Sequence, residues 1–423
     1  MDKLIVHGGV TLRGSINISG SKNASLPILA ASLLTPEPCI IRHVPDVSDT
    51  NYMIQILSAL GADVERSSGT VRITCEDISD QAPYELVRRM RASICVMGPL
   101  LARKGRAVVS LPGGCVIGDR PVDLHLRGLE ALGAQVEFAG GNITLTAKDG
   151  LRGAEINLCG THGPTVLGTG NVMMAATLAE GMTIIESAAA EPEVLDLANF
   201  LNAMGANIQG AGTRRIVIEG VPELHGIEHT VIPDRIEAGT FMVAAAIAGE
   251  GVTLRRVCRD HLKAITDAIE QTGHHVQFNA TGDVCTVQRN GHPRGIDLVT
   301  APYPGFPTDM QAQMTALLAT TPDVSIIKDT IFPQRFMHCA ELKRMGADIK
   351  VDHGTAVVRG IPQLSAAPVM ASDLRASAAL VLAALTAKGS TEIIRLYHID
   401  RGYEHIDEKL LMLGANVERL KER

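Results

Sequence analysis

Hydrophobic and polar positions repeat along the chain with a period of about 70 residues. Within a period, a helix of small apolar residues, such as residues 173–179 or 379–385, leads into a β-branched strand such as residues 183–186. A loop and a second, amphipathic helix follow, and two short strands around a Gly-Thr or Gly-Asn turn close the period. This order predicts a βαβαββ unit.

Six glycines mark the same position in each unit, namely Gly61, Gly133, Gly205, Gly273, Gly346 and Gly414, at spacings of 72, 72, 68, 73 and 68 residues. Each is expected to end the second helix in a positive-φ conformation. Six such units account for the whole chain and predict an α/β protein of two similar domains with three units each. A simple solenoid is the alternative, but solenoids of this period seldom mix strands and helices in this way.

The predicted domain boundaries follow from the repeat. The N-terminal domain covers residues 22–231, and the C-terminal domain covers residues 1–21 plus 232–423. Most units have a further strand after the hairpin, which begins with a segment such as residues 151–156, whereas the sixth unit ends without this segment. Residues 12–18 have a similar sequence and can supply the missing strand. The first 20 or so residues are therefore expected to pair within the C-terminal domain.

Composition narrows the class of protein. Hydrophobic residues make up 46% and charged residues 20%, which is typical of a soluble globular protein. Aromatic residues are only 3%, and the net charge is −7, so neither a nucleic-acid partner nor a stacking platform is expected. No signal peptide and no membrane-spanning run is visible, which predicts a cytoplasmic protein without a membrane partner. Eight scattered cysteines predict free thiols and no metal site.

Cations recur at two matched positions of the repeat. Lys22, Arg91, Arg235 and Arg375 stand where the first helix of a unit begins, against the preference of the helix dipole. Arg120 and Arg401 each lie 13 residues before their repeat glycine, and Arg335 lies 11 before its own. Arginine forks and free helix N–H groups both bind phosphate and carboxylate, so the pattern predicts a small, highly charged anionic substrate. For any single arginine, a surface ion pair is the ordinary alternative.

Reactive side chains accompany these cations. Cys115 lies among three glycines and two prolines, five residues before Arg120, where a thiol can act as nucleophile or acid. Asp309 opens a helix after a proline-defined loop and is either a proton acceptor or a helix N-cap; Asp373 and Asp49 have the same ambiguity. His125, His398 and His405 are candidate neighbours of the site, with structural roles as the default.

These residues resemble the UDP-N-acetylglucosamine 1-carboxyvinyltransferase family over essentially the full chain. The matching segments, in order, are residues 20–24, 90–93, 112–125, 306–313, 373–377 and 397–403. The resemblance implies two inside-out α/β domains with threefold internal repetition and an active site in the cleft between them. It also implies transfer of the enolpyruvyl group of phosphoenolpyruvate to the 3-hydroxyl of UDP-N-acetylglucosamine with release of phosphate, the first committed step of peptidoglycan synthesis, without a cofactor or metal.

The resemblance also assigns roles to residues of this chain. Lys22, Arg120 and Arg401 would clamp the phosphate, with Arg335 and Arg375 available for the carboxylate and the developing charge. Asp309 would be the base for the sugar hydroxyl, with Asp373 as a second proton-handling carboxylate. Cys115 would form a covalent phosphothioketal and donate a proton. Contacts to the sugar nucleotide would come from Asn23, Arg91, Arg120, Pro121, Val122, Asp123, Leu124, Asp309 and Ile331.

One segment departs from the family pattern, and two alternatives stay open. Residues 160–169 form a loop about three residues longer than the usual nucleotide-contacting loop. Enolpyruvyl transfer to shikimate 3-phosphate is the nearest rival function, and the Gly-Gly-Cys loop argues against it. A catalytically silent protein that binds a UDP-sugar is the rival from another class, and the presence of Lys22, Cys115, Asp309 and Arg401 disfavours it.

Overall fold

The computed structural model describes residues 2–111 and 122–421. The described residues divide into two compact units, which we call the N-terminal unit (20–111 and 122–232) and the C-terminal unit (2–19 and 233–421). Cys115, Arg120 and Pro121 lie outside the described residues. That the two units are separate domains, with the boundaries expected above, stays a prediction.

The N-terminal unit contains three larger sheets. The strand order of the first sheet is β15 (Glu228–Thr230), β3 (Cys39–Arg42), β5 (Thr70–Thr74) and β4 (Asp63–Ser67). In the second sheet it is β6 (Arg106–Ser110), β8 (Asn142–Thr146) and β7 (Gln135–Ala139). In the third sheet it is β13 (Asn207–Gln209), β14 (Arg215–Glu219), β12 (Met182–Glu186) and β9 (Glu155–Asn157). A small hairpin joins β10 (Cys159–Gly160) to β11 (Gly163–Pro164). Each sheet contains the antiparallel hairpin that the repeat predicts.

Three helices fill the interior of this unit, and we call them inner helices: α1 (Lys22–Ala31), α4 (Met97–Lys104) and α6 (Val166–Ala176). A 3-10 turn, η2 (Arg91–Val96), precedes α4, and another, η1 (Ser32–Leu34), follows α1. The inner helices are buried on nearly all sides because their residues are small and apolar. The second helices of the units are α2 (Ser48–Ala59), α5 (Asp123–Ala131) and α7 (Pro192–Ala203), and a short helix, α3 (Tyr84–Val87), precedes η2.

The C-terminal unit repeats this plan. The strand order of its first sheet is β17 (His275–Phe278), β18 (Val284–Gln288), β16 (Val252–Arg255) and β2 (Ser15–Asn17). In the second sheet it is β19 (Leu298–Val299), β20 (Val324–Lys328), β22 (Thr355–Arg359) and β21 (Asp348–Asp352). In the third sheet it is β23 (Val369–Met370), β24 (Ser390–Ile394), β1 (Lys3–His7) and β25 (Asn416–Leu420). Its inner helices are α8 (Arg235–Ala248), α10 (Gln311–Leu318) and α12 (Leu374–Thr386). Its second helices are α9 (Lys263–Gln271), α11 (His338–Arg344) and α13 (Ile406–Met412). The 3-10 turns η3 (Arg259–Leu262), η4 (Thr308–Met310) and η5 (Leu396–Arg401) precede α9, α10 and α13.

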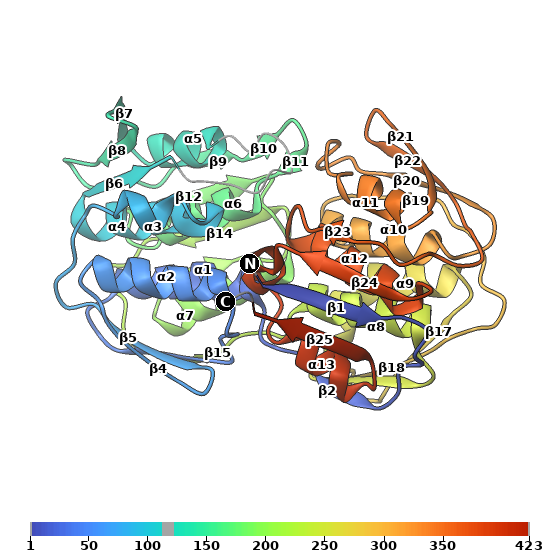
Figure 1. Cartoon of the computed structure of the whole chain (residues 1–423). Helices are drawn as coiled ribbons and strands as arrows, with labels where there is room; N and C mark the ends of the chain where they lie inside the picture. Colours follow the sequence, from blue (N-terminus) through green and yellow to red (C-terminus); the bar gives the residue numbers. More distant parts are fainter. Residues whose placement is uncertain (1, 112–121, 422–423) are drawn as a thin grey trace. The chain divides into compact units, whose positions relative to one another are not determined.

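The first residues of the chain close the last sheet of this unit. The prediction that residues 12–18 pair within the C-terminal part of the chain is confirmed, because β2 runs parallel to β16. The repeat did not reveal that β1 lies antiparallel between β24 and β25, where it supplies the missing strand of the sixth hairpin. Figure 1 shows this blue strand among the red strands of the C-terminal end.

Two further expectations are confirmed by the described residues. The six repeat glycines all have positive φ, between 86° and 107°, and end their second helices. Most described cysteines are buried, and burial raises the pKa of the thiols of Cys75, Cys95, Cys285 and Cys339 to about 12, so these thiols are inert. Among the residues described, no helix combines the length and apolar character that crossing a membrane requires.

Candidate active site

An acidic side chain and two arginines meet in the C-terminal unit. Asp309 lies in η4, which opens the inner helix α10, and Arg375 is the second residue of the inner helix α12. Arg335 lies between β20 and α11. Asp309 Oδ1 accepts a hydrogen bond from Arg335 Nη1 at 2.7 Å, and Asp309 Oδ2 accepts one from Arg375 Nη2 at 2.9 Å. The carboxylate therefore bridges the two guanidinium groups.

Burial of the two arginine side chains strengthens their electrostatic interaction with Asp309. The side chains of Arg335 and Arg375 are 6% and 2% exposed, whereas that of Asp309 is 28% exposed. Burial lowers the pKa of both guanidinium groups, but the charge and hydrogen bond of Asp309, together with the charges of other nearby acidic groups, raise both pKa values overall. Arg335 Nε is buried and has no hydrogen-bond partner within the described residues, so this side chain retains unused capacity to donate to an anion.

The structure shows which of the three candidate aspartates is a helix N-cap. Asp373 caps α12, since its side chain accepts hydrogen bonds from the backbone N–H groups of Arg375 and Ala376 at 2.9 and 3.1 Å. The position before η4 is Pro307, so the Asp309 side chain does not serve as its cap. The N-cap position of α2 is Val47, and Asp49 lies in the first turn. Of the three, only Asp373 is a helix cap.

A buried aspartate that the sequence analysis missed orders the loops around this cluster. Asp329, directly after β20, accepts hydrogen bonds from Thr308 Oγ1 at 2.7 Å and from Thr300 Oγ1 at 2.8 Å. It also accepts one from the backbone N–H of Ile331 at 3.0 Å. The same carboxylate therefore orders the turn that carries Asp309 and the segment that carries Ile331. The only signal in the sequence is an acidic residue at the end of an apolar strand.

Two further residues of the predicted site lie on η5 and its surroundings. Arg401 ends η5 and is half-buried. Burial lowers the pKa of His398, and the positive charge of Arg401 lowers it further. His398 is therefore neutral near pH 7, which fits a structural neighbour rather than a second cation. The described contacts do not bring Arg401 to Asp309, and its role in anion binding stays a prediction.

The N-terminal unit carries a second group of predicted residues at the start of α1. Ser21 caps this helix by accepting a hydrogen bond from the backbone N–H of Ala24 at 3.3 Å. Lys22 follows, and its Nζ lies 3.3 Å from Asp49 Oδ2, with the two side chains 12% and 3% exposed. Asp49 therefore holds the lysine in place. Asn23 is half-buried beside it.

The remaining residues of this group lie at other helix starts. Arg91 is the first residue of η2, which packs against α1, and it is half-buried. Val122 precedes α5, Asp123 and Leu124 open it, and Asp123 is exposed. His125 is buried, with Nδ1 3.0 Å from Asn171 Nδ2, so it has a structural bonding partner.

The longer loop at residues 160–169 is ordered by two local devices. Its first half forms the β10–β11 hairpin, with Cys159 opposite Pro164. Its second half begins α6, where Thr165 Oγ1 accepts a hydrogen bond from the backbone N–H of Gly168 at 3.1 Å. The extra residues therefore form a hairpin before a capped helix. Their contact with a nucleotide stays a prediction.

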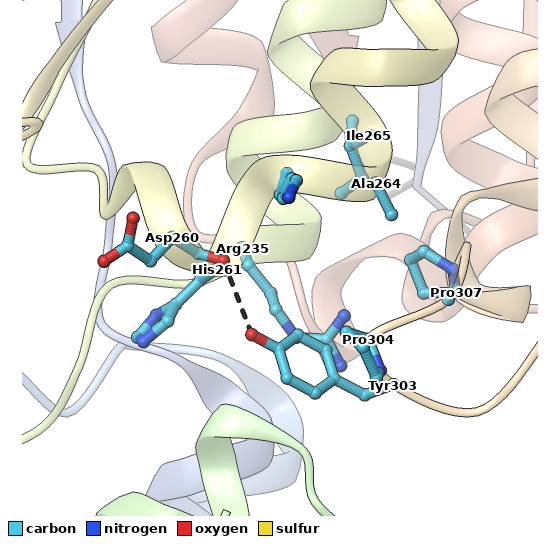
Figure 2. Close-up of a pocket in the computed structure, with 10 residues that line it drawn as sticks. Arg235, Asp260, His261, Ala264, Ile265, Tyr303, Pro304 and Pro307 are labelled. Carbon is cyan, nitrogen blue, oxygen red and sulfur yellow. Dashed lines mark hydrogen bonds between the residues drawn. The ribbon is translucent and has the colours of Figure 1, made fainter.

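Arg235 lies at a separate, small cavity of the C-terminal unit (Figure 2). Its guanidinium carbon is 5.8 Å from the centre of the Tyr303 ring, and Tyr303 Oη donates to the backbone carbonyl of Asp260 at 3.4 Å. The cavity has a volume of about 80 Å³, far below the roughly 300 Å³ or more of pockets that hold drug-sized ligands. Pro307 on its rim connects it in sequence to Asp309.

Comparison with known proteins shows similarity along the whole chain. The sequence profile of EPSP synthase (3-phosphoshikimate 1-carboxyvinyltransferase) matches residues 6–410. The UDP-N-acetylglucosamine 1-carboxyvinyltransferase of Akkermansia muciniphila is 71% identical over 420 residues, which cover 99% of each chain. The protein of the same name from Methylacidiphilum infernorum is 56% identical over 421 residues, again 99% of each.

Solved structures show the same architecture. The enolpyruvyl transferase NikO from Streptomyces tendae matches with a TM-score of 0.89 at 25% identity, covering 99% of this chain and 98% of NikO. An EPSP synthase from Acinetobacter baumannii matches with a TM-score of 0.74 at 18% identity over the full length of both chains, a likeness of fold alone. The predicted fold of inside-out α/β domains with threefold repeats is confirmed.

The fold, together with the profile match, defines the class as the carboxyvinyl, or enolpyruvyl, transferases. Within this class, identities of 52% to 71% over whole chains separate one family from the rest. The chain belongs to the UDP-N-acetylglucosamine 1-carboxyvinyltransferase family.

Proposed function

We propose that the protein transfers the enolpyruvyl group of phosphoenolpyruvate to the 3-hydroxyl of UDP-N-acetylglucosamine and releases phosphate, which commits the sugar nucleotide to peptidoglycan synthesis. The observation that carries this proposal is the 71% identity with a protein of that name over 99% of both chains. The likeness to EPSP synthases is far lower, at 18%, so the same transfer to shikimate 3-phosphate is the weaker candidate.

The reaction joins the sugar oxygen to C2 of phosphoenolpyruvate while C3 takes up a proton. The resulting tetrahedral intermediate then loses phosphate and a proton from C3, which restores the double bond. The protein must therefore bind a phosphate and a carboxylate, accept the proton of the hydroxyl, and exchange a proton at C3. No step needs a metal or cofactor to balance.

The Asp309 cluster supports a role in activating the hydroxyl. Arg335 and Arg375 donate to the two oxygens of Asp309, and such donors stabilise the charged form of a carboxylate. An anionic substrate that takes over one guanidinium would leave the carboxylate less neutralised and more basic. We infer that binding of phosphoenolpyruvate prepares Asp309 as the base, while Asp373 keeps the start of α12 in place as a cap.

The position of Lys22 supports the binding of phosphate. Lys22 stands at the N-terminus of α1, where free backbone N–H groups also favour an anion. We propose that Lys22, Arg120 and Arg401 bind the phosphate group. Asn23, Arg91, Ile331 and residues 120–124 are assigned to the sugar nucleotide. Cys115 is assigned to covalent chemistry and proton donation at C3, as the family resemblance implies.

The test combines turnover with detection of the covalent species. Phosphate release from phosphoenolpyruvate is measured with UDP-N-acetylglucosamine or shikimate 3-phosphate as acceptor, and intact-protein mass spectrometry follows mixing with both substrates. We expect release only with the sugar nucleotide, and an adduct that disappears in Cys115→Ser. Full activity of Cys115→Ser without an adduct would refute the assignment of Cys115. Binding of the sugar nucleotide by calorimetry without any phosphate release would indicate a silent binding protein.

The cytoplasmic location stays a prediction, which cell fractionation can check.

A further inference from the structure

A buried network of neutral side chains lies directly behind Asp309 and Arg375. It consists of Thr240 on α8, Gln313 on α10 and Tyr403 between η5 and α13, which are 1%, 0% and 2% exposed. With Arg375 on α12, it joins elements from all three repeats of the C-terminal unit. Buried hydrogen-bond networks of this kind restrict the geometry of the groups that they join. Gln313 Oε1 is the one oxygen of these three side chains without a partner within the described residues.

The hydrogen-bond directions in this network can be assigned. Gln313 Nε2 lies 2.9 Å from the backbone carbonyl of Asp309, which can only accept, so the amide nitrogen faces the Asp309 turn. Thr240 Oγ1 likewise donates to the carbonyl of Ile236 at 2.8 Å. Tyr403 Oη therefore donates to Thr240 Oγ1 at 2.8 Å and offers its lone pairs to Gln313 Nε2 at 3.2 Å.

The same tyrosine supports the guanidinium of Arg375. The guanidinium carbon lies 5.3 Å from the centre of the Tyr403 ring, within the range of a cation–π contact. Burial raises the pKa of the Tyr403 phenol, although the charge of Arg375 acts in the opposite direction. Tyr403 is therefore neutral at physiological pH, and it supports the cation without neutralising it.

We propose that Tyr403 and Gln313 are positioning residues of the transferase. Tyr403 sets the plane of the Arg375 guanidinium, and Gln313 holds the backbone of Asp309, so that the carboxylate and the cation meet in one geometry. A carboxylate in place of the phenol would compete with the substrate for Arg375, whereas a neutral ring leaves the cation available to an anion. This inference rests on the proposed function, and it concerns how that function is prepared.

The chain offers matched pairs of variants to test it. Tyr403→Phe keeps the ring and removes the hydroxyl, and Tyr403→Leu removes both. Tyr84→Phe and Tyr84→Leu are the controls, because Tyr84 is 57% exposed and carries an arginine, Arg88, 5.7 Å from its ring centre. Gln313→Met removes the donor to Asp309. Gln311→Met is its control, because Gln311 is equally buried on the same helix and its amide has no partner within the described residues.

The readout is steady-state kinetics on purified full chains that remain folded at the assay temperature. We expect kcat/KM for phosphoenolpyruvate to fall about tenfold in Tyr403→Phe and Gln313→Met, the loss of roughly one buried hydrogen bond. In Tyr403→Leu it should fall about 100-fold, as expected when a catalytic group is misplaced by about 1 Å. KM for the sugar nucleotide should change less than twofold, and the controls should match the parent.

Two results separate failure of this inference from failure of the proposed function. An active parent whose Tyr403 and Gln313 variants melt earlier but keep their kinetic constants would show a purely structural role and overturn the inference. If the parent itself released no phosphate, the proposed function would fail, and crystal structures would still test the positioning. A distance from Arg375 Nη2 to Asp309 Oδ2 that stays near 2.9 Å in Tyr403→Leu would overturn it, and a longer distance or a rotated guanidinium would support it.

Discussion

The two units connect their second and third inner helices through different chemistry. In the N-terminal unit, Asn171 on α6 donates to the carbonyl of Ile94 in η2 at 2.8 Å and accepts from the backbone N–H of Gly98 on α4 at 2.8 Å. In the C-terminal unit, the corresponding connection is the ion pair between Arg375 on α12 and Asp309 in η4. One connection is neutral, and the other is charged.

The neutral connection is sufficient to hold the helices together. Asn171 is fully buried, and the helices approach so closely that a Cβ on Gly98 would lie 2.3 Å from the backbone oxygen of Asn171. Burying charged groups costs free energy of desolvation, which a neutral amide avoids. The charged connection is therefore the more costly of the two in free energy of desolvation. The difference supports the proposal that the C-terminal cluster takes part in the chemistry, whereas the N-terminal network packs the helices.

The strongest test of this comparison is Asp309→Asn, which keeps the shape of the side chain and removes its charge. We expect kcat to fall roughly 10²- to 10⁴-fold, the usual contribution of a general base. The free energy of unfolding should also fall by up to about 3 kcal/mol, because two buried cations lose their counter-charge. Phosphate release and chemical denaturation measure the two effects.

A matched control for this variant is Asp348→Asn. Asp348 is half exposed and lies 3.8 Å from Arg359, in a surface ion pair of the same unit. Both its activity and its stability should stay close to those of the parent, since exposed pairs contribute about 0–1 kcal/mol. Activity of Asp309→Asn above a tenth of the parental value would contradict a catalytic role for the charged connection.

The second test is Asn171→Ala in the neutral network. The change leaves the N–H of Gly98 and the carbonyl of Ile94 without a side-chain partner, so the free energy of unfolding should fall by about 3 kcal/mol. The kinetic constants of the remaining folded protein should be unchanged. Asn207→Ala, at an exposed hydrogen bond to Glu219, is the control. A large loss of kcat in folded Asn171→Ala would remove the distinction between the two units.

The third and smallest effect concerns acid sensitivity near the charged cluster. Burial lowers the pKa of His338 to about 4, with Asp373 opposing and Arg335 reinforcing this shift. Because the unfolded chain binds the proton more readily, stability from the neutral imidazole is complete above pH ~6.5 and is lost as the pH falls toward 4. The free energy of unfolding should therefore be about 2 kcal/mol lower at pH 5 than at pH 7 from this residue alone.

Denaturation curves of His338→Gln at both pH values check this expectation. The variant should lack that share of the pH dependence, whereas His353→Gln, at a 96% exposed side chain, should retain it. Hydrogen exchange at pH 5 should locate the loss of protection in the C-terminal unit. An unchanged pH dependence in His338→Gln would show that another group controls acid sensitivity.

Most of the fold could be predicted from the repeat, because the repeat consists of local sequence signals. A glycine that ends a helix, as Gly61 and Gly414 do, depends on backbone conformation within a few residues, and periodicity registers such features directly. The insertion of β1 between β24 and β25 could not be found in this way. Its partners lie between 383 and 417 residues further along the chain, and no repeated segment marks the strand.

The residues of the site could be predicted from the sequence, but the side chains with which they pair could not. Asp309, Arg335 and Arg375 were all expected in the site. Both arginines were expected to bind the substrate, whereas each pairs with Asp309 in the structure. They are 26 and 66 residues from Asp309, and Arg375 comes from the next repeat, so the meeting of the three side chains depends on how two repeats pack. Asp329 and the Tyr403 network were missed for the same reason, since a buried polar residue is recognisable only by its neighbours.

The position of β1 has a consequence for the nascent polypeptide. Lys3 pairs with Leu420, so β1 must wait for the synthesis of β25 before both of its edges are covered. At ordinary rates of translation this delay is on the order of tens of seconds. The strands of the N-terminal unit, in contrast, find all their partners within residues 39–230 and can pair while synthesis continues. During that interval the backbone groups of β1 have no neighbouring strand to pair with, a condition that favours aggregation.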